Sequence, residues 1–452
     1  MTPITKQIVA GITGGLLTTS TVVVWAYPAA ALPQLEREDS KVHLTTEQAS
    51  WFASLAPMIT IPGAVMAAPI YEKFGPRKMM LVLTPVLCLS FMAMSLASLE
   101  VMSTMGLAQI ILLSSRVVQG FAVALLISII NVYIYEICGL SLRGTMVALS
   151  EFWASLGYLM CYFFACFYSW DKVALIIPVV TIIPSFIGAL ISPESPLWLA
   201  RAGKEEKARK VFKKVRCNEA EIILDQKVAS ETKESLLQLL TERCHLKAVI
   251  ASCLIFILNQ FTGYLVIAVY VVHIFEAAGV GLSPQWSSVI VGLFRTAFSA
   301  VSAFILHRAP RRLFLVVGCI FTGVASGIIG VFFFLQHKGL DVSSLSWLPL
   351  FGLVLYMIGY SGSVGATTWT SAVEVLPEPV RSIGFGLGVT NLSIIAFLLS
   401  KCFVGMKIIM GLYGIFWLFS CGSFIFAVVT IFYIPETLNK SLQDIKDYWE
   451  QH

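Results

Sequence analysis

One long apolar segment of the chain ends in the sequence PESPLWL at residues 193–199, and another ends about 240 residues later in PETLNKSL at residues 435–442. Two further pairs of charged motifs recur at nearly the same displacement, namely Glu136…Arg143 with Glu374…Arg381, and KFGPR at 73–77 with RAPRR at 308–312. Motif pairs at a nearly constant spacing are typical of an internal repeat. They predict that the chain consists of two homologous halves.

The composition indicates what kind of protein these halves form. Of the 452 residues, 57% are apolar and 13% are charged, and the mean hydropathy is +0.83. Soluble domains have about 45–50% apolar and about 25% charged residues, so an ordinary cytosolic enzyme, a disordered scaffold and a nucleic-acid-binding protein are excluded. A transmembrane helix needs about 20 apolar residues, and twelve spans of about 22 residues fit this length with room for one soluble insert. We therefore predict an all-α membrane protein with twelve transmembrane helices.

The distribution of basic residues predicts how these helices are oriented. The spans are expected to begin near Ile8, Ser50, Met79, Leu107, Met146, Val173, Ala248, Ser287, Leu313, Trp347, Ile383 and Ile409. Most of the 31 Lys and Arg residues then fall into loops on the side of the N-terminus. Because such loops face the cytoplasm, we expect a multi-pass protein with both termini in the cytosol.

One long polar stretch separates the two halves. We expect an N-terminal six-helix half at residues 1–200, a cytoplasmic linker at 201–247, a C-terminal six-helix half at 248–437 and a cytoplasmic tail at 438–452. The linker has helical periodicity after Gly203 and again over residues 226–243. It is predicted to form two or three short helices, with basic faces near anionic lipid.

No motif for covalent chemistry stands out. The ten cysteines and six histidines lack the spacing of a metal site, and the sequence has no phosphate-binding loop or nucleophile–base pair. We expect no enzymatic activity, no metal and no cofactor.

The two closing motifs resemble the P-E-S-P-R-W-L and P-E-T-K-G-[KR]-S-L signatures of the sugar-porter branch of the major facilitator superfamily. Over essentially the whole chain, the sequence is most similar to the insect facilitated trehalose and hexose transporters of that branch. The resemblance implies the major facilitator fold, with two pseudo-symmetric six-helix halves, and a sugar as the substrate. It also implies a plasma-membrane protein in the lipid bilayer that works as a monomer, without a nucleic-acid partner.

The loop after the second span resembles the family's D-R-x-G-R-R motif, with Gly75 where the tight turn requires a glycine. Arginine suits bidentate pairing with carboxylates, which stand at the cytoplasmic ends of spans four and ten. We predict an ion-pair network that closes the cytoplasmic side, formed by Glu72, Arg77, Glu136, Arg143, Glu194, Arg308, Arg312, Glu374, Arg381 and Glu436. Alternatively, these charges only mark the helix ends. In the second half His307 replaces an acid and Pro310 a glycine of the family pattern, which weakens that copy of the network.

A sugar site needs amides and hydroxyls that replace water and an aromatic face for the apolar side of the ring. The segment Asn259–Thr262, with Asn259, Gln260 and Thr262, is similar to the family's Q-Q-x-S-G in span seven, and Trp369 and Asn391 resemble further residues of the family's sugar site. The alternatives are helix–helix hydrogen bonding for the amides and a plain core role for the tryptophan. The chain departs from the family at Leu265, at Leu392 and in the missing prolines of span ten, where flexibility would come from Ser361, Gly362, Ser363 and Gly365.

Two charges stand where the family has neutral amides, Glu151 in span five and Arg295 in span eight. An unpaired charge near the bilayer centre costs at least about 2.5–3.5 kcal/mol. At about 1.5 Å per residue, the two lie roughly 12 and 18 Å from the cytoplasmic ends of their spans, a difference that long side chains bridge. We predict that they pair across the two halves within the substrate site. Arg116 is predicted to be structural, bonded to neighbouring backbone carbonyls.

Together these features predict a uniporter that moves a hexose or a trehalose-like disaccharide by alternating access. A proton-coupled symporter is an alternative, although span one has no carboxylate and Glu151 is the carboxylate placed deep in a span. A nutrient sensor or degenerate carrier that binds without transporting is another, because the cavity carries charges and lacks family residues.

Overall fold

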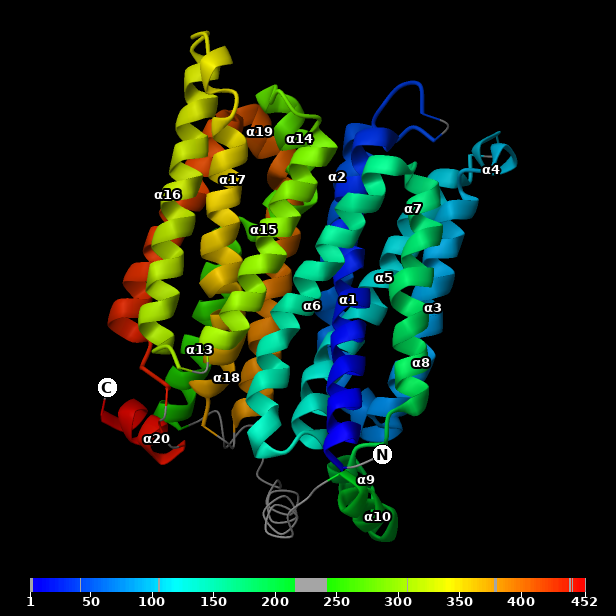
Figure 1. Cartoon of the computed structure of the whole chain (residues 1–452), viewed down its shortest axis with the longest axis vertical. Coiled ribbons are helices and arrows are strands. Elements are labelled where there is room, and N and C mark those ends of the chain that lie inside the picture. Colours follow the sequence, from blue (N-terminus) through cyan, green and yellow to red (C-terminus); the bar gives the residue numbers. More distant parts are fainter. Residues whose placement is uncertain are drawn as a thin grey trace.

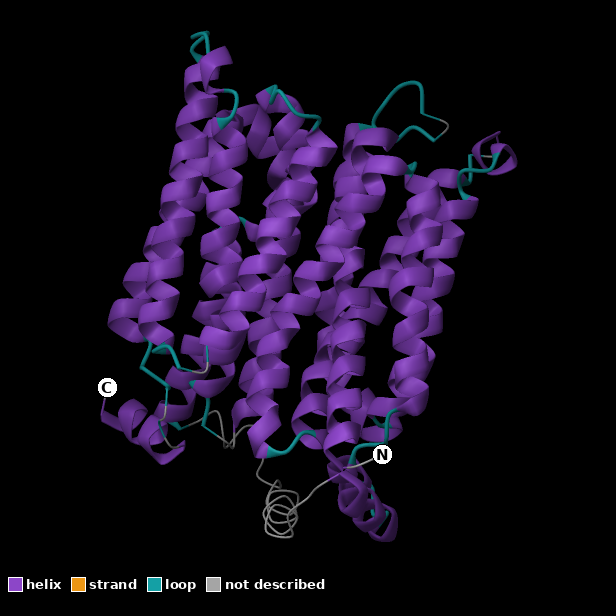
Figure 2. Cartoon of the chain, viewed as in Figure 1, coloured by secondary structure: helices purple, strands orange, loops and turns teal. Residues whose placement is uncertain are grey.

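The computed structural model describes residues 3–40, 42–104, 106–215, 242–306, 308–377, 380–438, 440 and 442–451. Every regular element within these ranges is a helix (Figure 2). The helices run roughly parallel to one another and form two bundles that lie side by side (Figure 1).

The N-terminal bundle contains six long helical segments. The first five are α1 (Pro3–Leu35), α2 (Thr46–Phe74), α3 (Pro76–Leu96), α5 (Ala108–Ile137) and α6 (Leu140–Phe167), with the short α4 (Glu100–Thr104) in a loop. The sixth segment joins α7 (Trp170–Ile177) and α8 (Ile183–Ile191) through the π-helical turn η1 (Pro178–Ile182). A proline at the start of η1 lacks the amide proton that a regular α-helix needs, which explains the irregular turn.

The C-terminal bundle repeats this arrangement. Its seventh to tenth spans are α13 (Arg243–Phe261) with α14 (Tyr264–Ala278), α15 (Pro284–Ile305), α16 (Arg311–His337), and α17 (Leu348–Gly359) with η3 (Tyr360–Val364) and α18 (Gly365–Glu374). The short η2 (Ser343–Leu345) precedes α17. The last two spans form α19 (Arg381–Tyr433), which is interrupted at Gly411, with φ 67°. An unbroken helix of 53 residues would be about 80 Å long, far more than the roughly 30 Å of a bilayer core.

The prediction of twelve spans agrees with these segments. Ten segments are long and apolar enough to cross a membrane. The helix α6, with 28 residues, adds one span, and the break at Gly411 divides α19 into two. The observed starts lie within a few residues of the predicted ones.

One end of the molecule, which we call the linker end, carries both chain termini together with α9 (Pro196–Arg201), α10 (Glu205–Val215) and α20 (Leu442–Gln451) (Figure 1). The amphipathic α10 buries Ala208, Phe212 and Val215, as its sequence predicts. Most of the second amphipathic stretch, residues 226–243, lies outside the described residues.

The two bundles contact each other through the helix pairs α6 with α15, α2 with α19, α1 with α14, and α6 with α18. At the end opposite the linker, His273 Nε2 lies 3.1 Å from Glu36 Oε2. Nearby, the Lys401 ammonium lies 4.0 Å from the centre of the Trp51 ring, and Ser50 Oγ donates to the Lys401 carbonyl at 3.1 Å. The halves are therefore in contact at this opposite end.

Candidate substrate site and linker-end network

Arg295 on α15 lies at the interface between the halves. Its Nη2 donates to Glu151 Oε1 at 3.1 Å and its Nε donates to Ser155 Oγ at 3.1 Å, both on α6. The side chains of Arg295 and Glu151 are 2% and 10% exposed. The predicted ion pair across the halves is therefore present, and each charge has its counter-ion within hydrogen-bond distance.

Tyrosine rings surround the Arg295 guanidinium, a feature that the sequence analysis missed. The guanidinium carbon lies 4.0 Å from the centre of the Tyr158 ring and 4.8 Å from that of Tyr264. Such cation–π contacts contribute about 0.5–2 kcal/mol each, depending on desolvation. No sequence signal distinguishes these tyrosines from the other aromatic residues of the apolar spans.

The same rings connect Arg295 to the break in span seven. Tyr264 stacks on Tyr360 with ring centres 4.1 Å apart, and Tyr360 lies parallel to Tyr356 at 6.1 Å. The Tyr356 hydroxyl donates to the Thr262 carbonyl at 3.1 Å. Thr262 is thus part of the structure around the break between α13 and α14.

Gly263 forms this break because it adopts the left-handed conformation, with φ 85°. Only glycine takes that conformation readily. A Cβ on Gly263 would also lie 2.2 Å from the Phe419 ring. The end of α13 therefore presents its last polar residues at a fixed bend.

Asn259 and Gln260 are the polar residues at this bend. They are 2% and 4% exposed, and neither Asn259 Oδ1 nor Gln260 Oε1 has a hydrogen-bond partner. A buried polar group without a partner costs about 1–3 kcal/mol. Both amides are consequently prepared to bond to a polar molecule that enters between the helices.

Trp369 on α18 and Asn391 on α19 are half-buried. The Trp369 ring contacts Phe256 edge-to-face, with centres 5.2 Å apart, and Phe385 at 6.2 Å. Directly before Trp369 in the sequence, the buried hydroxyls of Thr367 and Thr368 lack partners. α13 and α18 pack against each other, so the amides and the tryptophan lie on neighbouring helices.

The flexibility predicted for span ten without its prolines coincides with the π-helical turn η3. The hydroxyl of Ser363 donates to the Phe314 carbonyl, whereas that of Ser361 is buried without a partner. Gly365 follows directly, and a Cβ there would lie 3.1 Å from Glu151 Cδ. The irregular turn therefore brings α18 against the ion pair.

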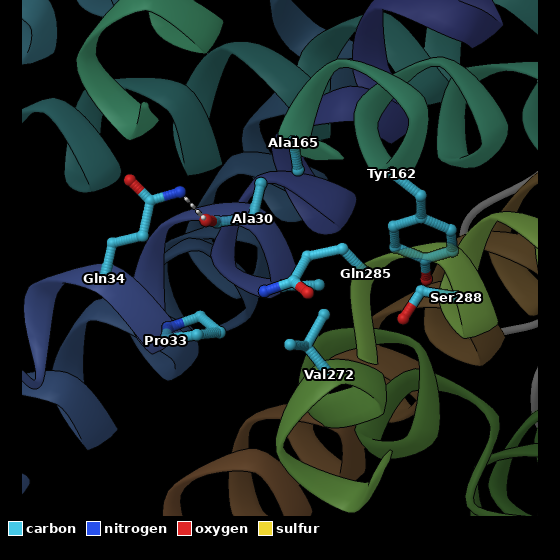
Figure 3. Close-up of a pocket in the computed structure, with 9 residues that line it drawn as sticks. Ala30, Pro33, Gln34, Tyr162, Ala165, Val272, Gln285 and Ser288 are labelled. Atoms are coloured by element: carbon cyan, nitrogen blue, oxygen red, sulfur yellow. Dashed lines mark hydrogen bonds between the residues drawn. The ribbon is translucent and has the colours of Figure 1, made fainter. Parts of the chain in front are cut away.

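A pocket lies between the halves, closer to the opposite end than the ion pair (Figure 3). It is narrow, with a cavity volume of about 10 Å³, and is lined by Ala29, Ala30, Pro33, Gln34, Tyr162, Ala165, Val272, Gln285 and Ser288. Ser288 precedes Arg295 on α15 by about two helical turns. Tyr162 lines the pocket, and its hydroxyl donates to the Ala268 carbonyl at 2.8 Å.

At the linker end of the N-terminal bundle, Glu136 is the centre of a polar cluster. Its carboxylate accepts hydrogen bonds from the Tyr71 hydroxyl at 2.5 Å and from Ser195 Oγ, and it forms an ion pair with Arg201. The carboxylate of Glu194 accepts from the backbone amide of Arg77 at 3.1 Å, at the start of α3. Burial raises the pKa of Glu194, and this hydrogen bond opposes the rise.

The C-terminal half repeats the same arrangement. Glu374 Oε2 accepts from Thr437 Oγ1 at 2.6 Å and from Arg311 Nε at 3.4 Å. Glu436 accepts from the backbone amides of Arg311 and Arg312 at 2.9 and 3.0 Å. A carboxylate at a helix start satisfies free amides and interacts favourably with the helix dipole, so Glu194 and Glu436 cap α3 and α16.

Four of the five predicted acids, Glu136, Glu194, Glu374 and Glu436, are therefore engaged. The guanidinium groups of Arg77 and Arg381, two of the predicted bases, donate to backbone carbonyls instead. The Arg77 guanidinium donates to the Leu190 carbonyl at 2.7 Å, because the last carbonyls of α8 are free to accept there. Arg312 meets Glu436 through its backbone amide, and Arg381 Nη2 donates to the Leu376 carbonyl at 3.4 Å. The described ion pairs of Glu136 and Glu374 are with Arg201 and Arg311, which the predicted network did not include.

The other predicted residues of the network are Glu72, Arg308 and Arg143. The side chains of Glu72 and Arg308 are exposed, and the Glu72 carbonyl accepts from Trp198 Nε1 at 3.0 Å. The side chain of Arg143, in the first turn of α6, is outside the described part, as is His307. The ion pairs that the described side chains make at the linker end each lie within one half.

Arg116 has the structural role predicted for it. Its guanidinium donates to the carbonyls of Val24 at 2.7 Å and Phe52 at 3.0 Å, and to Gln119 Oε1 at 2.9 Å. It thereby joins α1, α2 and α5 inside the N-terminal bundle.

Three side chains around the start of α13 lie close together and are of types that can bind metals. Glu242, Cys244 and His245 each place a ligand atom within 4.8 Å of the others. Glu242 is exposed and lies 3.3 Å from His245 Nδ1, an ordinary contact between side chains three residues apart on a helix.

Comparison with known proteins identifies the family. The family model described as "Sugar (and other) transporter" matches residues 7–449. The chain belongs to the sugar transporter family. Its relatives are thus transporters rather than enzymes, and the resemblance found in the motifs is confirmed.

Among curated proteins, this sugar transporter is 28% identical over 451 residues to the facilitated trehalose transporter Tret1-2 homolog of Drosophila sechellia, covering 98% of this chain and 90% of the relative. It is also 28% identical over 450 residues to trehalose transporter 1 of Drosophila melanogaster. That match covers 97% of this chain and 51% of the relative, so the chain spans about half of that relative's length.

Solved structures confirm the major facilitator fold. The chain matches the proton:xylose symporter XylE bound to 6-bromo-6-deoxy-D-glucose with a TM-score of 0.80 at 18% identity, covering 99% of both chains. It matches the inward open conformation of XylE from E. coli with a TM-score of 0.78 at 17% identity, covering 99% of this chain and 100% of that one. At such identities the likeness extends to the fold alone.

Proposed function

We propose that the chain is a facilitative uniporter for a hexose or a trehalose-like disaccharide that works by alternating access. The observation that carries this proposal is the pair of buried, unpartnered amide oxygens of Asn259 and Gln260 at the bend of span seven. Sugar hydroxyls both donate and accept hydrogen bonds, so they satisfy such groups in place of water. The curated relatives are named facilitated trehalose transporters, which supports the same substrate class.

Transport without a coupled proton is favoured by the state of Glu151. A carboxylate that drives symport has to lose its counter-ion and bind a proton during each cycle. Glu151 instead has Arg295 at 3.1 Å, which balances its charge without a proton. This argument, together with the absence of an acidic residue from α1, places uniport ahead of symport.

In this proposal the halves at residues 1–200 and 248–437 move as bodies around the central site, joined by the linker at 201–247. The linker end faces the cytoplasm, because basic residues concentrate there, with α10 as an example. The protein acts as a monomer in the plasma membrane. Since the halves are in contact at the opposite end, the described state is closed to the outside.

The linker-end charges have a second role in the proposed cycle. When the cavity opens outward, Glu136 and Glu374 approach arginines of the facing half, Arg381 and Arg143, and these contacts hold the cytoplasmic side closed. The test is the transport rate of an Arg143→Ala carrier, which is expected to fall. An unchanged rate would contradict the gating role and leave the charges as markers of helix ends.

The function is tested by uptake of labelled glucose and labelled trehalose into proteoliposomes that contain the purified protein, with and without an imposed proton gradient. Saturable uptake that is indifferent to the gradient is expected, and Gln260→Leu should reduce it at least about tenfold, the effect of one lost polar contact. The matched control is Gln336→Leu, because the Gln336 amide donates to the Ala277 carbonyl in the last turn of α14, at the opposite end. Accumulation that requires the gradient would establish symport instead.

Absence of uptake in folded protein would favour a sensor or a degenerate carrier. The observation that supports this second candidate is the ion pair of Glu151 and Arg295, because it links the two halves at the centre of the site. A sensor would still bind sugar, which an increase in melting temperature on adding glucose or trehalose would detect.

A further inference from the structure

Arg295 has hydrogen-bonding capacity that the protein does not use. A guanidinium has five N–H donors. The Nε group bonds to Ser155 and the Nη2 group bonds to Glu151, whereas Nη1 is buried without a partner. A guanidinium that is 2% exposed and keeps a free donor is prepared for an acceptor from a ligand.

Free acceptors lie on the elements that pack against Arg295. The amide oxygens of Asn259 and Gln260 lack partners, and so do the hydroxyls of Ser361 and Thr367. α15 contacts η3 and α18, and α18 contacts α13, so these groups belong to one packed region. A ligand that satisfies both the free donor and the free acceptors has to offer both kinds of group, as hydroxyls do.

The charge of such a ligand is restricted by Glu151. With Glu151 at 3.1 Å from Arg295, the region is electrically balanced before a ligand enters. A carboxylate on the ligand would compete with Glu151 for Arg295 and leave one negative charge uncompensated. An ammonium group would add a positive charge beside Arg295. Either excess charge near the bilayer centre is unfavourable, whereas a neutral polyol adds none.

We propose that Glu151 and Arg295 set the charge class of the transported solute. The balanced pair admits neutral polyols and excludes sugar acids and amino sugars, and removal of one partner changes the class that is accepted. This inference rests on the proposed function and adds the specificity of the same site.

Glu151 lies beside α18, the helix that carries Trp369, the candidate for stacking on the sugar ring. This position supports a role of Glu151 in selecting the solute. A Cβ on Gly365 would lie 3.1 Å from Glu151 Cδ, and Trp369 follows Gly365 on α18 by about one turn. Tyr158 and Tyr264 cover the guanidinium at 4.0 and 4.8 Å and keep it from moving toward another anion. The charge pair is therefore fixed beside the helix that carries Trp369.

The experiment compares proteoliposome uptake of labelled glucose, glucuronate and glucosamine, three solutes of similar size and different charge. The proteins are the wild type, Glu151→Gln, Arg295→Gln, the double variant, and Glu38→Gln as a control that removes an exposed acid from a loop. The wild type and the control are expected to take up glucose only. Glu151→Gln should raise the ratio of glucuronate to glucose uptake at least about tenfold, since Arg295 is then free to pair with the solute.

The other variants complete the design. Arg295→Gln should raise the ratio of glucosamine to glucose uptake, and the double variant should exclude both charged solutes again. Uptake ratios that stay at the wild-type values in folded single variants would overturn the proposal. If neither single variant folds, competition on the wild type decides, because glucuronate that inhibits glucose uptake as strongly as unlabelled glucose contradicts the charge restriction.

Failure of the proposed function gives a different result. In that case the wild type takes up neither glucose nor trehalose, whereas failure of this inference leaves neutral sugar uptake intact and changes only its selectivity. Glucuronate taken up by the wild type in place of glucose would contradict both.

Discussion

Replacing Glu151 by leucine removes the counter-ion of Arg295 and leaves the guanidinium buried between α6 and α15. At a separation of 3.1 Å and an effective dielectric constant of about 20, the attraction between the two charges is about 5 kcal/mol. Breaking a buried pair by removing one partner costs about 3–5 kcal/mol in measured cases, which agrees with this value. We expect Glu151→Leu to lower the free energy of unfolding by a comparable amount.

Replacing both residues by leucine should be less harmful than this single change. The double variant leaves no uncompensated charge, and exchanging a buried pair for apolar residues is often neutral. The remaining loss comes from the contacts of Arg295 with Tyr158 and Tyr264, about 0.5–2 kcal/mol each. Ser155→Ala is the matched control, because it removes a single hydrogen bond to the charged Arg295, worth about 1.5–3 kcal/mol, and leaves the ion pair in place.

The assay is the melting temperature of purified protein in one detergent, measured for the wild type, both single variants and the double variant. The reasoning predicts that the double variant melts above Glu151→Leu, with a strong departure from additivity. The reasoning would be refuted if the losses of stability in the two single variants added up to that of the double variant within about 0.5 kcal/mol, because independent sites behave in that way.

Three further predictions concern the bundles themselves. Arg116→Leu should lower the free energy of unfolding by more than about 3 kcal/mol, because three hydrogen bonds are lost in the core, and the melting temperature should fall accordingly. A stability within about 0.5 kcal/mol of the wild type would exclude the structural role. Gly263→Ala should abolish uptake or folding, because φ at Gly263 is 85° and the new Cβ would collide with the Phe419 ring. The control Gly281→Ala should match the wild type, because the space around a Cβ at that position is open. Glu436→Ala should cost about 1–3 kcal/mol through the lost cap of α16, and Glu436→Gln, which keeps an acceptor oxygen, should cost less by the same melting assay.

Two buried arginines, Arg116 and Arg295, show which features of the site can be predicted from the sequence. Arg116 and Arg295 lie in apolar spans, where a charge requires a partner, and few candidates exist at the right depth. Glu151 was therefore identifiable as the partner of Arg295 from its depth together with the family resemblance, and Arg116 was expected to bond to neighbouring backbone carbonyls. Both expectations agree with the structure. Burial of charge limits the possibilities strongly enough for sequence reasoning to succeed.

The linker-end bases show where this reasoning fails. Several arginines of the linker end are candidates for each predicted carboxylate, and the loop backbone decides which of them reaches it. Arg201 was assigned to the polar linker, yet α9 folds back so that its guanidinium meets Glu136. The Arg311 guanidinium contacts Glu374, while Glu436 accepts from the backbone amides of both Arg311 and Arg312. Such choices depend on loop geometry, for which the sequence has no periodic signal.

The tyrosines around Arg295 were missed for another reason. Tyr158, Tyr264 and Tyr360 come from three separate elements, and each alone is an ordinary aromatic residue of an apolar span. Their convergence depends on the crossing of α6 with the C-terminal half and on the turn at Gly263. By contrast, the serine and glycine residues of span ten correctly indicated an irregular segment, because small residues remove the packing that keeps a helix regular.

The most direct test of the central claim is counterflow of labelled glucose or trehalose in proteoliposomes that are preloaded with the same unlabelled sugar and held without a proton gradient or membrane potential. A uniporter with alternating access exchanges labelled for unlabelled sugar through one site, so a transient accumulation of label above the outside concentration is predicted. The Glu38→Gln control should give the same overshoot as the wild type. Label that never exceeds the outside concentration in folded protein, or accumulates only when a proton gradient is imposed, would contradict the account.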